Sequence, residues 1–183
     1  MKLYSSIFFL RHLKTINNKM NIISGQSDSE IIKKEYATVN LMNFDKIYCS
    51  PSIRCQKTLE ILGNNSLSAE KIVYDNRLLE RDMGHFEGLS KTECKKMYPK
   101  LFINGAFDVF QTPPQGESYE KFKKRVSSFY DEILKPSNQL NILVCSHNQT
   151  LKLLRLLILG KNITYKTWME YSFENGEFSK VKN

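Results

Sequence analysis

The chain has 183 residues, of which 41% are hydrophobic and 25% charged, and this composition is typical of one globular domain with a sizeable core. The net charge of +8 favours anionic partners, although we assign most of it to a solvated, lysine-rich exterior. No basic tract predicts nucleic-acid binding, and no apolar stretch approaches the roughly 20 residues of a membrane span, so we expect neither partner.

The four cysteines (Cys49, Cys55, Cys94 and Cys145) show no CxxC or zinc-type spacing. No signal peptide is visible, because the apolar run near the N-terminus is short and is cut by Arg11. We therefore expect a cytoplasmic protein with reduced thiols, in which Cys49 and Cys145 pack in the core.

The first half of the chain alternates short apolar runs with amphipathic segments. These predict a strand over 6–10, a loop over 17–27, a helix from Asp28 to Val39, a strand over 45–49, a helix over 53–62 stopped by Gly63, and a strand over 71–74. The helix after Asp28 is predicted because Ile31, Ile32, Tyr36 and Val39 recur on one face.

The second half continues the alternation. It predicts a charged loop over 78–88, a helix over 89–97, an irregular stretch over 102–115, a helix over 118–134, a strand over 141–145 and a leucine-rich buried helix over 149–159. The tail, residues 170–181, alternates around Asn175-Gly176, which predicts a hairpin.

Strands separated by helices indicate βαβ units. We therefore predict a single α/β domain over residues 1–183, a three-layer α/β/α sandwich whose mostly parallel sheet ends in an antiparallel C-terminal hairpin. The edge strand of that hairpin could pair with a second copy of the chain, so a homodimer is one expected arrangement.

Two of the three histidines directly follow apolar runs of strand length. Arg11-His12 ends one run, and Ser146-His147 follows another. Because ligands bind at the carboxyl ends of parallel strands, we expect two imidazoles and a guanidinium at one site. Histidine acts as a neutral nucleophile or as an acid or base near neutral pH, and arginine binds phosphate, so the pattern favours phosphate chemistry.

Five segments extend this pattern in chain order. They are Arg11-His12-Leu13-Lys14-Thr15 with Asn18, Ser50-x-x-x-Arg54 with Thr58, residues 79–88, Gly116-Glu117-Ser118, and Ser146-His147-Asn148. Over residues 8–154 the chain resembles the histidine phosphatase superfamily, the phosphoglycerate mutase-like proteins. That family's pattern is Arg-His-Gly-(Glu/Gln)-Thr-x-x-Asn, Ser-x-x-x-Arg-x-x-x-Thr, Leu-x-Glu-x-x-x-Gly-x-x-Glu-Gly, Gly-Glu-Ser and Ser-His-Gly.

The resemblance implies a role for each matching residue. His12 would form a phosphohistidine, Glu80 would act as general acid and then general base, and Arg11, Arg54 and His147 would bind the phosphoryl group. No metal or cofactor is implied, because cationic side chains neutralise the phosphate. Asp82, Glu87 and Glu117 compete for the acid role, but Glu80 matches the family's position. Glu87 is expected to tie its loop together, and His85 to lie on the pocket wall or the surface.

Asn18, Ser24 and Gly25 either contact substrate or only shape the first loop, and both interpretations stay open. The chain also departs from the family at Leu13, Lys14 and Asn148. Lys14 would add a charge that binds a second acidic group of the substrate, and Asn148 would replace a glycine at positive φ. Leu13 would crowd the pocket or shift the backbone beside His12.

The function implied is metal-independent hydrolysis of a small phosphorylated metabolite by a phosphatase. A mutase-type phosphotransferase is one alternative, but the resemblance to mutases implies a basic insert with paired arginines, which residues 91–115 lack. A catalytically impaired relative that binds a phosphorylated ligand is another. The sequence leaves the substrate open among sugar phosphates, phosphoglycerates, nucleotide-pathway phosphates and phosphoproteins.

Overall fold

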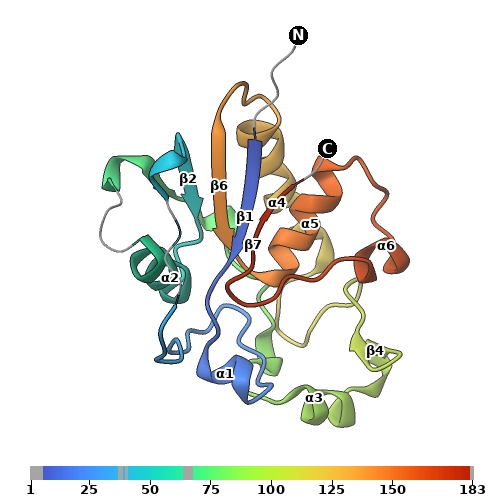
Figure 1. Cartoon of the computed structure of the whole chain (residues 1–183). Coiled ribbons are helices and arrows are strands. Elements are labelled where there is room, and N and C mark those ends of the chain that lie inside the picture. Colours follow the sequence, from blue (N-terminus) through green and yellow to red (C-terminus); the bar gives the residue numbers. More distant parts are fainter. Residues whose placement is uncertain (1–5, 37–38, 40, 64–67, 182–183) are drawn as a thin grey trace.

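A computed structural model describes residues 6–36, 39, 41–63 and 68–181. In this part of the chain, five strands form one sheet in the order β3-β2-β6-β1-β7 (Figure 1). The strands are β1 (Ser6–Arg11), β2 (Lys46–Cys49), β3 (Ile72–Tyr74), β6 (Asn141–Ser146) and β7 (Phe178–Lys180). β7 alone pairs antiparallel, against β1, so the sheet is mostly parallel as predicted.

Helices cover both faces of the sheet, which gives the predicted three layers (Figure 1). Side chains of neighbouring strand residues alternate between two cores. Phe9 and Val144 pack with α4 (Tyr119–Phe129) and α5 (Asn148–Ile158), whereas Leu10 and Cys145 pack with α2 (Ile53–Gly63). Burial of apolar area on both faces therefore fixes the strands whose ends carry the histidines.

Shorter elements gather beyond the carboxyl ends of the parallel strands (Figure 1). They are α1 (Ile16–Lys19), α3 (Lys91–Met97), α6 (Tyr165–Met169) and the small hairpin of β4 (Phe102–Ile103) and β5 (Ala106–Phe107). Single 3₁₀ turns span 41–43, 69–71, 76–78, 84–86 and 99–101, and a π turn over 130–134 extends α4. Within the described residues, no helix is both long enough and apolar enough to cross a bilayer.

The predicted helix from Asp28 is wrong over residues 28–36, while residues 37, 38 and 40 lie outside the described ones. This segment runs extended beside the chain after β1, where Ile32 donates its N–H to Lys14 O (2.9 Å) and Ile16 donates to Glu30 O (2.9 Å). Ile31 and Tyr36 still pack against the core on the α2 side. The apolar residues recur at the spacing of one helical face, which is why the sequence predicts a helix. In the structure the backbone pairs with residues 14–16 instead, and this pairing buries the same side chains without a helix.

The C-terminal tail takes a different form from a two-stranded hairpin. The turn at Asn175-Gly176 is present, with Gly176 at φ +80°, but residues 170–177 contain no strand. Gly176 donates its N–H to Arg11 O and His12 O, both at 3.1 Å, and β7 then pairs with β1. The tail is therefore anchored to the end of β1 itself.

Candidate active site

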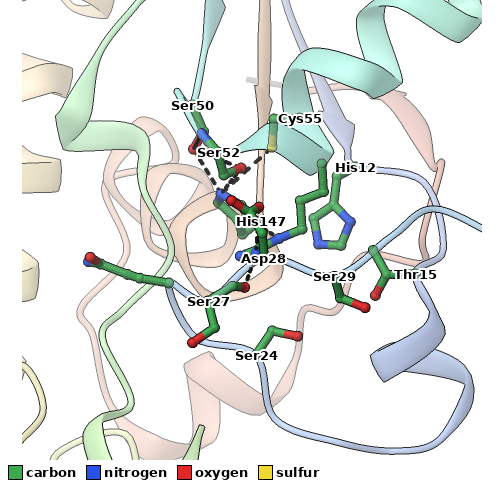
Figure 2. Close-up of polar contacts among 12 residues, drawn as sticks. His12, Thr15, Ser24, Ser27, Asp28, Ser29, Ser50, Ser52, Cys55 and His147 are labelled. Carbon is green, nitrogen blue, oxygen red and sulfur yellow. Dashed lines mark hydrogen bonds and ion pairs between the residues drawn. The ribbon is translucent and has the colours of Figure 1, made fainter. Parts of the chain in front are cut away.

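Three neighbouring strand ends deliver the main side chains of the site. β6 lies between β1 and β2, so His12, Ser50 and His147 leave the sheet side by side. His12 donates its N–H to Ser146 O (3.0 Å), and Ser50 donates its N–H to Cys145 O (2.9 Å). The rings of His12 and His147 lie 5.2 Å apart between centroids (Figure 2), which confirms that the strand ends bring the two imidazoles together.

His12 is neutral, and among the described residues one of its two ring nitrogens has no hydrogen-bond partner. Its Nδ1 lies 2.8 Å from Leu13 O, and because a carbonyl can only accept, the proton is on Nδ1. Burial, followed by the charges of Arg54 and Arg11, lowers the pKa of His12 to about 3. Nε2 therefore carries a lone pair at neutral pH, and His12 lines a cavity.

His147 uses both ring nitrogens within the protein. Its Nε2 lies 2.9 Å from Ser50 Oγ and 3.3 Å from Ser52 Oγ, while Nδ1 accepts from Arg54 Nε at 3.3 Å (Figure 2). The ring is fully buried, which lowers its pKa well below the usual value. His147 is therefore a neutral ring that orients Arg54.

Arg54, near the start of α2, is 2% exposed. Its Nη1 donates to Ser27 O and its Nη2 to Gly25 O, each at 2.6 Å, and Asp28 Oδ1 lies 3.5 Å from Nη1. These contacts and the bond to His147 hold the guanidinium in one orientation at the cavity wall.

The loop that receives Arg54 depends on Gly25 and Glu87. Gly25 has φ +50°, and a Cβ there would come 2.0 Å from Glu87 Oε1. Glu87 accepts the N–H of Met83 (3.0 Å) and so ties its own loop together as expected. It also accepts the N–H groups of Gln26 (2.9 Å) and Ser27 (3.0 Å) in the first loop. The positive φ and the close contact with Glu87 both require glycine at position 25. Because Gly25 O accepts a hydrogen bond from Arg54, the position of the guanidinium depends on the geometry of this loop.

Arg11 reaches the cavity from the end of β1. Its Nη1 donates to Phe173 O at 2.5 Å, and its buried Nε has no partner within the described residues. Burial lowers the pKa of Arg11, yet a guanidinium remains cationic at neutral pH. Asn148 Oδ1 accepts from Phe173 N–H (3.0 Å), so α5 holds the segment that Arg11 contacts.

Glu80 occupies the N-terminus of α5. Its carboxylate accepts from the N–H groups of Gln149 (3.1 Å) and Thr150 (3.3 Å) and thereby caps the helix. Of the four acid candidates, only Glu80 lines the cavity in the described structure. Asp82 accepts from Gly84 N–H (2.8 Å) and Glu117 pairs with Arg125 (2.7 Å), so both have structural partners elsewhere.

The cavity has a volume of about 430 Å³. Most of the predicted site residues line it: Arg11, His12, Asn18, Ser24, Gly25, Arg54, Glu80, His147 and Asn148. Sequence reasoning missed the rest of the wall, which includes Lys91, Phe102, Phe107, Lys152, Trp168 and Met169. Lys152 had a usable signal, because it is the first cation in a leucine-rich helix and lies five residues after His147.

Two of the predicted loop residues are structural as well as exposed to the cavity. Asn18 Oδ1 accepts from Thr15 N–H and from Asn175 Nδ2, both at 3.1 Å, and Ser24 Oγ accepts from Asn17 Nδ2 at 3.2 Å. They shape the first loop and also line the cavity.

The three departures from the family pattern lie differently from what we expected. Lys14 is exposed and does not line the cavity. Leu13 is 2% exposed and packs in the core beside Leu10, so the expectation that it crowds the pocket is wrong. Asn148 begins α5 and has no positive φ, so that expectation is also wrong. His85 is exposed, in agreement with its surface interpretation.

Comparisons with known proteins show which sequences this chain resembles. The chain is 29% identical over 160 residues to a 2,3-bisphosphoglycerate-dependent phosphoglycerate mutase of Cytophaga hutchinsonii, covering 82% of this chain and 75% of that protein. It is 33% identical over 136 residues to fructose-2,6-bisphosphatase TIGAR of Xenopus tropicalis, covering 69% of this chain and 48% of that protein.

The fold matches as well. The structure aligns with that of the alpha-ribazole phosphatase from Shigella flexneri with a TM-score of 0.76 at 19% identity, covering 96% of this chain and 89% of that one. Residues 7–182 match the family profile described as histidine phosphatase superfamily (branch 1). With nearly the whole chain matched and both histidines at adjacent strand ends, the protein belongs to the histidine phosphatase superfamily.

Proposed function

We propose that the protein is a metal-independent phosphomonoester hydrolase that acts through a phosphohistidine on His12. The observation that carries this proposal is the state of His12, a neutral imidazole that lines the cavity, with its proton held on Nδ1 by Leu13 O and its Nε2 without a partner among the described residues. Two arginines, Arg11 and Arg54, line the same cavity and match the charge of a phosphomonoester.

The first step transfers the phosphoryl group to the protein. The lone pair of His12 Nε2 forms a bond to phosphorus while the bond from phosphorus to the leaving oxygen breaks. Glu80, in its protonated form, gives its proton to that oxygen, and an alcohol leaves. The hydrogen bond from Nδ1 to Leu13 O stabilises the positive charge that develops on the ring.

The second step releases phosphate. Water attacks phosphorus, the bond from nitrogen to phosphorus breaks, and the ionised Glu80 takes the proton of the water. Inorganic phosphate leaves and His12 returns to its neutral form. Arg11 and Arg54 bind the equatorial oxygens in both steps, so the same two arginines stabilise the negative charge of the phosphoryl group throughout the reaction.

We assign His147 a positioning role in this reaction rather than the direct phosphoryl contact implied by the family resemblance. Both of its ring nitrogens are engaged, one with Ser50 and one with Arg54. His147 therefore acts by orienting the Arg54 guanidinium, which is the planar donor that binds the phosphoryl oxygens.

Hydrolysis fits the segment over residues 91–115 better than mutase chemistry does. That segment forms α3 and the β4–β5 hairpin and contains no arginine, whereas the resemblance to mutases implies a basic insert there. The cavity of about 430 Å³ suits a small phosphorylated metabolite, which we propose as substrate in a cytoplasmic setting.

Release of phosphate from an aryl phosphate, with a chelator present, tests this proposal. The wild-type protein should hydrolyse the aryl phosphate. His12→Ala should lower the rate of phosphate release by at least about 10³-fold, as expected for removing a nucleophile. His85→Ala, which removes an exposed histidine, should keep the wild-type rate. Equal rates for wild type and His12→Ala would refute the enzyme proposal and favour a binding protein. Turnover of phosphoglycerates with a bisphosphate primer and negligible phosphate release would favour the mutase alternative.

A further inference from the structure

Lys152 is a buried cation that the reaction above does not use. It lies on α5, is 7% exposed and lines the cavity. Its Nζ lies 4.8 Å from the centre of the Trp168 ring, a cation–π contact. Within the described residues its Nζ has no carboxylate partner and no hydrogen bond. By contrast, the exposed Lys161 beyond the same helix pairs with Glu170 at 2.9 Å.

A buried ammonium without an anion is unfavourable, because burial removes the water that stabilises its charge. Burial lowers the pKa of Lys152 to about 8, and the charge of Glu80 opposes this shift. Lys152 is still mostly protonated at neutral pH. Trp168 offsets part of the cost, but its ring cannot replace a counter-ion.

The cavity as a whole has more cations than one phosphoryl group requires. Arg11 and Arg54 lie beside His12, whereas Lys152 and Lys91 approach from α5 and α3. Among the described residues that line the cavity, Glu80 is the sole carboxylate, and it is bound to the N-terminus of α5. An excess of positive charge therefore lines the cavity, and Lys152 and Lys91 contribute to it from elements other than those that carry His12 and Arg54.

We propose that Lys152 binds a second anionic group of the substrate, a carboxylate or a second phosphate carried on the leaving group. This inference rests on the proposed function, because it concerns which phosphomonoester the same cavity takes. The residue that we expected to bind such a group, Lys14, lies outside the cavity, so Lys152 takes over that role. Lys152 acts in selecting the substrate and takes no part in the chemical steps.

The test compares substrates that differ only in the second group. The matched pair is 3-phosphoglycerate, which has a carboxylate, and glycerol 3-phosphate, which has a hydroxymethyl group in its place. Fructose 1,6-bisphosphate and fructose 6-phosphate form the corresponding pair for a second phosphate. We expect wild-type kcat/KM to favour one of the anionic members by about 10- to 100-fold, the range for a hydrogen bond to a charged group.

Lys152→Met should remove that preference and leave kcat/KM for an aryl phosphate within a few-fold of wild type. Lys152→Arg should retain much of the preference, because it keeps the charge. Lys123→Met, which removes an exposed lysine on α4, controls for net charge and should behave as wild type. Melting temperature separates binding from structure, since removing an unpaired buried charge should leave Tm unchanged or raised.

Two outcomes would overturn the proposal: a wild type that hydrolyses aryl phosphate with no preference in either pair, or a Lys152→Met variant that keeps the preference. A lowered Tm with equal loss on every substrate would assign Lys152 a structural role instead. If no phosphomonoester is hydrolysed, the proposed function fails separately. Calorimetry of 3-phosphoglycerate against glycerol 3-phosphate, with wild type and Lys152→Met, would then still decide whether Lys152 binds the carboxylate.

Discussion

The two ends of the cavity differ in how firmly their side chains are held. At the inner end, His12, Arg54 and His147 each have fixed partners within the protein. At the outer end, Lys152 contacts the ring of Trp168 and has no hydrogen bond or carboxylate partner among the described residues, and the wall comes from α3, the β4–β5 hairpin and α6. The inner end is organised before any substrate arrives, whereas the outer end keeps a charge without a partner. This difference suggests that the inner end performs the reaction and the outer end selects what reacts.

Glu80 belongs to the inner end, and its replacement should give the largest of the three effects considered next. Glu80→Gln keeps one oxygen, which can accept from Thr150 N–H, but its amide nitrogen cannot accept from Gln149 N–H, so the helix cap is weakened and Tm should fall slightly. The variant cannot deliver a proton, so hydrolysis of alkyl phosphates should fall about 10²- to 10⁴-fold. An activated aryl phosphate, whose leaving group needs no proton, should lose far less in the phosphorylation step.

Rates of phosphate release across a series of leaving groups, with the first turnover resolved from later ones, would check this prediction. A steeper dependence on leaving-group pKa in Glu80→Gln supports the acid role. Glu120→Gln is a matched control, because Glu120 is exposed on α4 and does not line the cavity. Equal losses for aryl and alkyl substrates would exclude Glu80 as the acid.

The next largest effect should come from the guanidinium that His147 orients. Arg54→Ala removes a planar donor and should lower kcat/KM by about 10²- to 10³-fold, by analogy with losing one oxyanion donor. Ser50→Ala should cost less, because it removes one of the two hydroxyl groups beside His147 Nε2 and leaves that of Ser52. Arg77→Ala, at an arginine paired with Asp75, is the control. Steady-state kinetics would show the order, and a larger loss in Ser50→Ala than in Arg54→Ala would contradict it.

The inner end was largely predictable from sequence, because local patterns set it. An apolar run followed by a histidine places that histidine at a strand end, and His12 and His147 meet since their strands are neighbours. Glu80 also followed from its motif. The sequence could not predict the direction in which each side chain points. Leu13, for example, follows His12 in the chain, yet its side chain packs in the core.

The outer end was not predictable, because no local pattern sets it. Its wall combines Lys91, Phe107, Lys152 and Trp168, which come from separate elements and meet only through tertiary packing. The helix expected after Asp28 failed for a related reason. Its backbone pairs with residues 14–16, and no periodicity within the segment can reveal a distant partner.

The smallest of the three effects concerns stability and tests whether folding keeps His12 neutral, through burial and the charges of Arg54 and Arg11. The folded pKa of about 3 lies below the ordinary value of 6.5, so as pH falls the unfolded chain binds the proton first. Stability is therefore lost as pH falls from about 6.5 towards 3. His12 alone should make the free energy of unfolding about 2 kcal/mol lower at pH 5 than at pH 7. His147 adds a loss of the same sign, because its pKa is also lowered.

Urea unfolding at pH 7 and pH 5 would measure this loss, with His12→Gln as the variant that cannot titrate. The difference between the two pH values should shrink in His12→Gln compared with wild type. The measurement needs no ligand, so it examines the inner end by itself. An equal pH dependence in wild type and His12→Gln would mean that His12 titrates normally. His12 would then be protonated over much of the acid range. The inner end, like the outer end, would become organised only when a substrate binds.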